Sequence, residues 1–194
     1  MTFLDISGYT LRELTDLYSL NVMDDNFYDV IADQILRLDE KYLMLIYNKL
    51  SLNQKRGAVY SLRNSLKDIE SAVEFLSEIL WDSSEDALTR SEAAISLRHL
   101  HKCIEIYDFY KLYRDDSEHL RSAATLLASS VEGIRGEVLS TAIADSSPIV
   151  RQFVLDIIDD NSYTEYLYLA RNCLKDADAD VRLAAQTALD NNVL

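Results

Sequence analysis

The chain of 194 residues contains few of the residues that break helices or crosslink small folds. It has four glycines, one proline (Pro148) and two cysteines, Cys103 and Cys173. So little glycine and proline argues against a flexible linker or a proline-rich tract. Two distant cysteines do not make a disulfide framework, and we expect both to be small buried side chains on helices. We therefore predict one continuous domain over residues 1–194.

Positive charge is also scarce. The chain has 33 acidic residues against 19 lysines and arginines, which gives a net charge of −14. Binding to a phosphate backbone depends on clustered cations, so direct binding of nucleic acid is disfavoured. A broad negative field attracts basic partners, although the same charge also keeps a soluble protein dispersed. Both interpretations stay open from composition alone.

The sequence lacks a long apolar run and a basic segment near Met1. We expect neither a signal peptide nor a membrane helix, and hence no membrane association and a cytoplasmic location.

Motifs of enzymes and metal sites are missing as well. The only close pair of glycines is Gly133 and Gly136, which does not make a phosphate-binding loop. His99 and His101 stand two residues apart and point in different directions on a helix, and we favour packing over metal binding for His99 with Cys103. We predict a protein that is not an enzyme, with no catalytic residue, metal or cofactor.

What the sequence does contain is a segment that returns about every thirty residues. Asp115, Asp145 and Asp176 open its copies, and two residues after each acid the chain reads SEHLRSAATLL, SPIVRQFVLDII and DADVRLAAQTAL. Its arginine recurs at Arg56, Arg121, Arg151 and Arg182, and Ser91 takes its place in one copy. Small apolar residues three and six positions later form one helical stripe. This period predicts an all-α solenoid of about six antiparallel helical hairpins.

Other amphipathic stretches alternate with these helices and supply the second half of each hairpin. They lie at about residues 40–50, 69–80, 102–113, 131–144 and 162–174. Residues 10–20 and 25–38 form one more pair, so residues 1–50 are interpreted as a degenerate N-terminal repeat and cap, and residues 51–194 as the clearer repeats. Acidic and hydroxyl residues in the loop before each helix are expected to be N-caps, and Pro148 suits a first helical turn.

The recurring acid, loop, Val-Arg, Ala pattern resembles the HEAT-repeat family, especially the short-period type that includes bilin-lyase-like proteins. The resemblance implies that the Val-Arg helices form an inner layer and that the acids and arginines of the pattern are structural. The ladder residues implied in this way are Asp115, Asp145, Asp176, Arg121, Arg151 and Arg182.

Side chains between the copies of the repeat are the candidates for binding a partner. Helical spacing from the repeat arginine places polar residues on the inner face, and tyrosine is enriched at protein interfaces. The predicted partner-binding residues are Tyr60, Glu92, His99, Gln152, Asp156, Asp159, Gln186, Tyr107, Tyr110 and Tyr113. Acids on such a surface suit a basic groove on another protein.

Small acidic proteins of this kind are similar to immunity proteins that neutralise nuclease toxins. The leading prediction is therefore an acidic protein that covers the nucleic-acid-binding surface of a basic nuclease toxin. One alternative is a general adaptor or assembly factor. Another is a bilin-lyase-like or nucleic-acid-modifying HEAT enzyme, which predicts a deep pocket with a carboxylate or histidine of shifted pKa.

Overall fold

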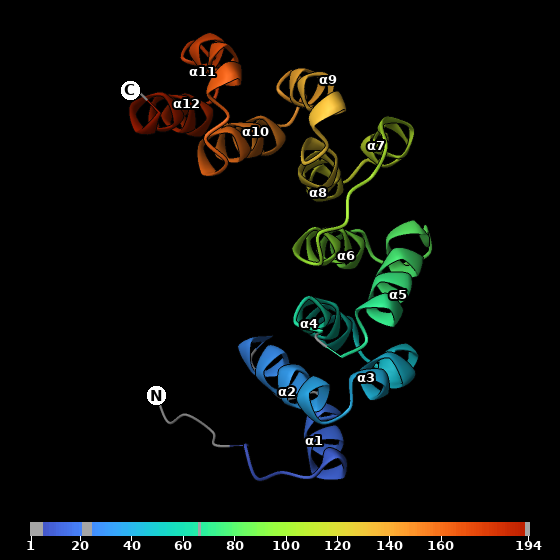
Figure 1. Ribbon diagram of the computed structural model, residues 1–194. Coiled ribbons are helices and arrows are strands. Elements are labelled where there is room, and N and C mark those ends of the chain that lie inside the picture. Colours follow the sequence, from blue (N-terminus) through green and yellow to red (C-terminus); the bar gives the residue numbers. More distant parts are fainter. Residues whose placement is uncertain (1–5, 21–24, 66, 193–194) are drawn as a thin grey trace. The chain divides into compact units, whose positions relative to one another are not determined.

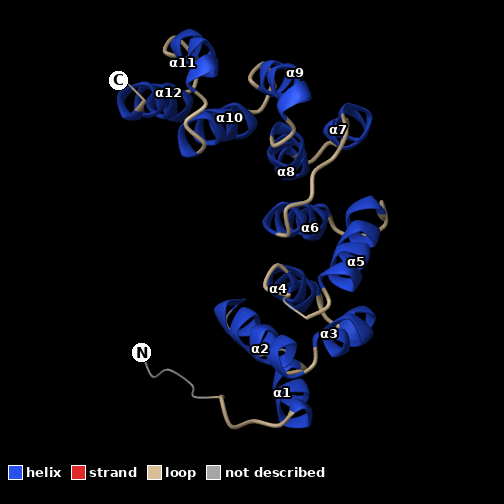
Figure 2. Ribbon diagram, viewed as in Figure 1, coloured by secondary structure: helices blue, strands red, loops and turns tan. Residues whose placement is uncertain are grey.

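The computed structural model describes residues 6–20, 25–65 and 67–192. Every regular element within these residues is a helix, which confirms the all-α prediction (Figure 2). Contacts divide the chain into two compact units, residues 1–101 and residues 102–194, and each unit is described by itself. The division falls inside the region of clear repeats and not at residue 50.

Unit 1 is built on three helices that pack on one another in series, α2 on α4 and α4 on α6 (Figure 1). The remaining helices of the unit pack against this series, with α1 on α2, α3 on α2 and α4, and α5 on α4 and α6. The helices are α1 (Leu11–Tyr18), α2 (Asp25–Leu38), α3 (Glu40–Ile46), α4 (Leu52–Leu62), α5 (Ile69–Trp81) and α6 (Ala87–His99), with a 3-10 turn at Tyr47–Lys49.

Unit 2 repeats this plan. Helices α8, α10 and α12 pack in series, and α7, α9 and α11 pack against them (Figure 1). The helices are α7 (Ile106–Tyr113), α8 (Glu118–Ser129), α9 (Glu132–Ala142), α10 (Pro148–Asp160), α11 (Leu167–Cys173) and α12 (Ala179–Asn191), with a 3-10 turn at Thr164–Tyr166. Each amphipathic stretch found in the sequence therefore contains a helix.

The repeat positions form the buried side of the even-numbered helices from α4 to α12. Three positions after the repeat arginine every side chain is buried, and so is every side chain six positions after it. The first set is Val59, Ala94, Ala124, Val154 and Ala185, and the second is Leu62, Leu97, Leu127, Ile157 and Ala188. The small residues allow neighbouring helix axes to approach closely.

Acidic and hydroxyl residues of these loops are the N-caps, as expected, but the capping residue is not the acid that opens the loop. The N-caps of α8, α10 and α12 are Ser117, Ser147 and Asp178, each two residues after the acid. The acid instead accepts a hydrogen bond from the backbone amide of the cap residue, as Asp145 Oδ1 does from Ser147 at 2.8 Å. The Asp145 carboxylate also accepts hydrogen bonds from Arg121 of the preceding repeat. Pro148 is the first residue of α10, as predicted.

The two cysteines differ. Cys173 ends α11 and is buried, in agreement with the prediction, whereas Cys103 is exposed and lies in the segment before α7. The expectation for Cys103 is wrong because α7 begins only at Ile106. His99 is the last residue of α6, so a helix junction separates it from Cys103.

Candidate partner-binding surfaces

The repeat arginines of unit 2 bind the acid of the following repeat. Arg121 donates from Nε to Asp145 Oδ2 at 2.8 Å and from Nη2 to Oδ1 at 2.9 Å. Its third nitrogen, Nη1, donates to the backbone carbonyls of Asp115 and Asp116 at 3.0 and 2.9 Å. One guanidinium thus joins the loop of its own repeat to the next one.

Arg151 repeats this arrangement atom for atom. Nε and Nη2 bind the two oxygens of Asp176 at 2.8 and 2.7 Å, and Nη1 donates to the carbonyls of Asp145 and Ser146. Arg182 makes only the second half of the pattern, with Nη1 on the carbonyls of Asp176 and Ala177 at 2.7 and 2.9 Å.

Burial and hydrogen bonding act against each other on Asp145. Its side chain is only 5% exposed, and burial by itself favours the neutral acid. Hydrogen bonds from Arg121, Tyr113 and the Ser147 amide outweigh this and lower the pKa of Asp145 to about 2. The carboxylate is ionised and fully engaged inside unit 2, so it is not a surface for a partner. That these contacts stabilise the fold stays a prediction.

Unit 1 contains a related pair of contacts. Arg56 donates to Asp86 at 2.9 Å, and Lys55 donates to Glu85 at 2.7 Å. Tyr47 also donates its hydroxyl to Glu85 at 3.0 Å. The acid that meets the repeat arginine here is thus the N-cap residue of α6 itself.

The predicted partner residues of unit 1 gather around a cation that the sequence analysis had not selected. Arg63 follows α4; its guanidinium carbon lies 3.6 Å from the centre of the Tyr60 ring. Nη2 of Arg63 binds the carboxylate of Glu92, and Nη1 lies 3.5 Å from Nε2 of His99. Tyr60 is exposed, whereas Glu92 is half-buried.

Burial and neighbouring charges shift the pKa values of Glu92 and His99 in this cluster. Burial raises the pKa of Glu92 even though Arg63 acts in the opposite direction. Burial and the positive charges of Arg63, Arg98 and His101 lower the pKa of His99. Because Arg63 neutralises Glu92, these residues do not form an acidic surface. Among the predicted partner-binding residues, the acids without a cationic partner are therefore Asp156 and Asp159 of unit 2.

The predicted polar residues of unit 2 lie on α10 and α12, which pack against each other. Asp159 accepts hydrogen bonds from the side-chain amides of Asn191 and Asn192, both at 2.8 Å, which ties the ends of the two helices together. On α12, Gln186 is exposed and donates to Asp190 at 2.7 Å. Gln152 is half-buried on the first turns of α10.

Asp156 differs from Asp159 because no described residue donates a hydrogen bond to it. It is half-buried, and Asp159 and Asp160 follow it at the helical spacings of three and four residues. Burial, followed by the charges of Asp160 and Asp159, raises the pKa of Asp156. We call Asp156, Asp159 and Asp160 the acidic cluster. Asp160 was missed at the sequence level, although its spacing from Asp156 was the signal that could have revealed it.

The three tyrosines of α7 are not equivalent. Tyr107 is 77% exposed. Tyr110 donates its hydroxyl to Glu137 at 2.8 Å, and Tyr113 donates to Asp145 at 2.6 Å. Two of the three rings therefore support packing within unit 2, and Tyr107 leaves its ring open to solvent.

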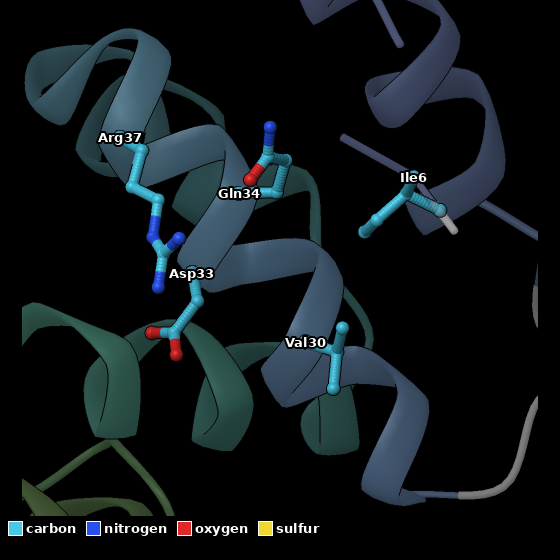
Figure 3. A pocket seen from close by; sticks show the side chains of 5 residues that line it. All are labelled: Ile6, Val30, Asp33, Gln34 and Arg37. Carbon is cyan, nitrogen blue, oxygen red and sulfur yellow. The ribbon is translucent and has the colours of Figure 1, made fainter. Parts of the chain in front are cut away.

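A small hollow opens beside α2, between the N-terminal segment and the helix (Figure 3). Ile6, Val30, Asp33, Gln34 and Arg37 line it, and none of them is a predicted site residue. Within the described residues, no group of histidine, cysteine and acidic side chains could hold a metal ion. No helix of this part of the chain is long and apolar enough to cross a membrane.

Comparison of the chain with family models, curated proteins and solved structures finds no match. The resemblance to HEAT repeats thus depends on the internal repeat itself.

Proposed function

We propose that the chain is a non-enzymatic, protein-binding α-solenoid of about six HEAT-like hairpins that binds a basic partner through the acidic cluster of unit 2. The observation that carries this proposal is Asp156. A half-buried carboxylate beside two others costs free energy in the unbound protein because burial and like charge both disfavour its ionised form. A lysine or arginine of a partner offsets both costs.

The surroundings of the cluster suit a protein partner. Amide side chains at Gln152 and Gln186 offer donors and acceptors beside the acids, and Tyr107 adds an exposed ring on α7 of the same unit. Charge complementarity of this kind mainly increases the rate of association and selects the partner.

The most concrete form of the proposal is an inhibitor that neutralises a nuclease toxin in the cytoplasm. A nuclease must present cations to hold a phosphate backbone. An acidic protein that covers those cations excludes the substrate, and a net charge of −14 gives the long-range attraction.

The test is inhibition of a purified basic nuclease domain encoded beside this gene. The wild-type chain should inhibit it, and Asp156→Lys/Asp160→Lys should slow association about tenfold or more at low salt. Asp159 is left intact because it holds Asn191 and Asn192.

Glu74→Lys/Glu78→Lys is the matched control. It makes the same change of charge at the same spacing, on α5 in unit 1. Equal loss of inhibition in both variants would show that net charge, and not the acidic cluster, is responsible. Failure of the wild-type chain to bind the nuclease would refute the inhibitor proposal.

A further inference from the structure

At the same positions of the repeat, unit 1 carries cations where α10 and α12 of unit 2 carry acids. Seven and eight residues after the repeat position, Arg63 and Asn64 directly follow α4, and Arg98 and His99 are the last two residues of α6. The same positions of unit 2 hold Ile158 and Asp159 at the end of α10, and Leu189 and Asp190 at the end of α12. The C-terminal ends of the even-numbered helices are thus cationic in unit 1 and acidic at α10 and α12 of unit 2.

The cations of unit 1 come from neighbouring helix ends. Lys67 donates from Nζ to the backbone carbonyl of Arg37 at 3.1 Å, which places it at the end of α2. Arg63 lies 3.5 Å from His99, which joins the end of α4 to the end of α6. Arg98 acts on His99 through its charge. We call Arg37, Arg63, Lys67, Arg98 and His99 the cationic strip.

The acids next to the strip are engaged in contacts of their own. Asp33 accepts from the amide of Asn64 at 3.3 Å, and Glu92 binds Arg63. Asp39 accepts from the first two backbone amides of α3 that follow Glu40. Figure 3 shows Arg37 and Asp33 on the same side of α2.

Two physical effects bear on these cations. Cations at helix C-termini are favoured by the helix dipole, which accounts for their position along each helix. The dipole does not account for their accumulation across three helices, where repulsion from Arg63 and Arg98 adds to burial in lowering the pKa of His99. Carboxylates of a partner relieve this repulsion.

We propose that the cationic strip of unit 1 is a second docking surface, which receives an acidic segment of a protein partner. This inference rests on the proposed function, by which the chain binds other proteins, and adds a second chemistry of partner, a carboxylate-rich segment. A carboxylate segment is favoured over a nucleic acid because the strip holds few cations and the chain as a whole carries a charge of −14.

The experiment uses the full chain and three fluorescently labelled probes at low salt: octaglutamate, octalysine and the oligonucleotide dT8. Arg37→Glu/Lys67→Glu should weaken octaglutamate binding about tenfold and change octalysine binding no more than the net-charge control does. Asp156→Lys/Asp160→Lys should do the reverse. Arg12→Glu/Arg171→Glu, at exposed positions outside the strip, is the control for net charge.

Each outcome has a separate meaning. Octaglutamate binding that is absent, or equally weakened by the Arg12→Glu/Arg171→Glu control, overturns the second docking surface. Tighter binding of dT8 than of octaglutamate also overturns it, in favour of a phosphate-binding strip. If Asp156→Lys/Asp160→Lys leaves the affinity for octalysine unchanged, the proposed function is refuted instead. If the Arg37→Glu/Lys67→Glu variant has a lowered melting temperature, Arg37→Gln/Lys67→Gln repeats the test with a smaller change of charge.

Discussion

Replacing Arg121 with alanine tests whether the repeat arginines hold the repeats of unit 2 together. The change removes the two bonds to Asp145 and the two bonds to the carbonyls of Asp115 and Asp116. The Asp145 carboxylate, which is only 5% exposed, then keeps only the Tyr113 hydroxyl and the Ser147 amide as hydrogen-bond donors. Arg121→Ala therefore removes one partner of a nearly buried ion pair.

The expected cost follows from that geometry. Removing one partner of a buried ion pair costs about 3–5 kcal/mol, and the remaining donors of Asp145 favour the lower end. A loss of about 3 kcal/mol lowers the melting temperature of a chain of this size by roughly 6–12 °C. Thermal unfolding followed by circular dichroism at neutral pH measures the shift.

Arg182→Ala is the matched comparison because Arg182 makes only the two carbonyl contacts. Its cost should be about 1 kcal/mol. A cycle with Asp145→Ala should give a coupling of about 1–3 kcal/mol between Arg121 and Asp145. An Arg121→Ala protein that melts no lower than Arg182→Ala, or a coupling near zero, would refute the structural role of the arginines.

Three further outcomes are expected. The pKa of Asp145 falls from its ordinary value of 3.8 to about 2 on folding. The ionised carboxylate therefore contributes about 2 kcal/mol of stability above pH 4, and this contribution is lost as the pH falls towards 2. Denaturant unfolding at several pH values should show the unfolding free energy decrease in this way, and Arg121→Ala should lack the decrease. Gly133→Ala, whose added β-carbon meets nothing within 4 Å, should stabilise the protein by roughly 0.5–1 kcal/mol. Gly57→Ala should melt at a lower temperature than Gly133→Ala, because a β-carbon there would lie 3.0 Å from Asp29 Oδ1 and 3.3 Å from Tyr28 Cβ; equal melting shifts would contradict this. Tyr113→Phe should cost about 1–2 kcal/mol in unfolding free energy, since it removes a hydrogen bond to a buried carboxylate, and an unchanged melting temperature would argue against it.

The helices and their buried stripe could be predicted because both follow from short-range periodicity. Val154 and Ile157, for example, are buried because they share one face of α10 with Val150. The loops that hold the N-caps could be predicted as well, but not which residue of each loop is the cap, since several acids and serines compete for the same amides. Only the three-dimensional loop shows that Ser147 caps the helix while Asp145 accepts from the Ser147 amide and binds Arg121.

The candidate surfaces were harder to predict, because they depend on side chains that meet across helices. Arg63 reaches Glu92 from 29 residues away, and Asp159 meets Asn192 from 33 residues away. No pattern along the chain reports such pairs. Arg63 was therefore absent from the surface predicted around Tyr60, whereas the predictions for Asp156 and Asp159, which are close in sequence, need only the helical period of α10 and stay predictions.

The central claim is that a cation of a partner docks on Asp156. A carbon-13 NMR titration of the Asp156 carboxyl in the full chain, with and without octalysine at constant ionic strength, tests it most directly. The pKa should lie above that of an ordinary aspartate in the free protein and fall when octalysine is added. A pKa that does not respond to octalysine, or responds equally to the same charge added as sodium ions, would contradict the claim.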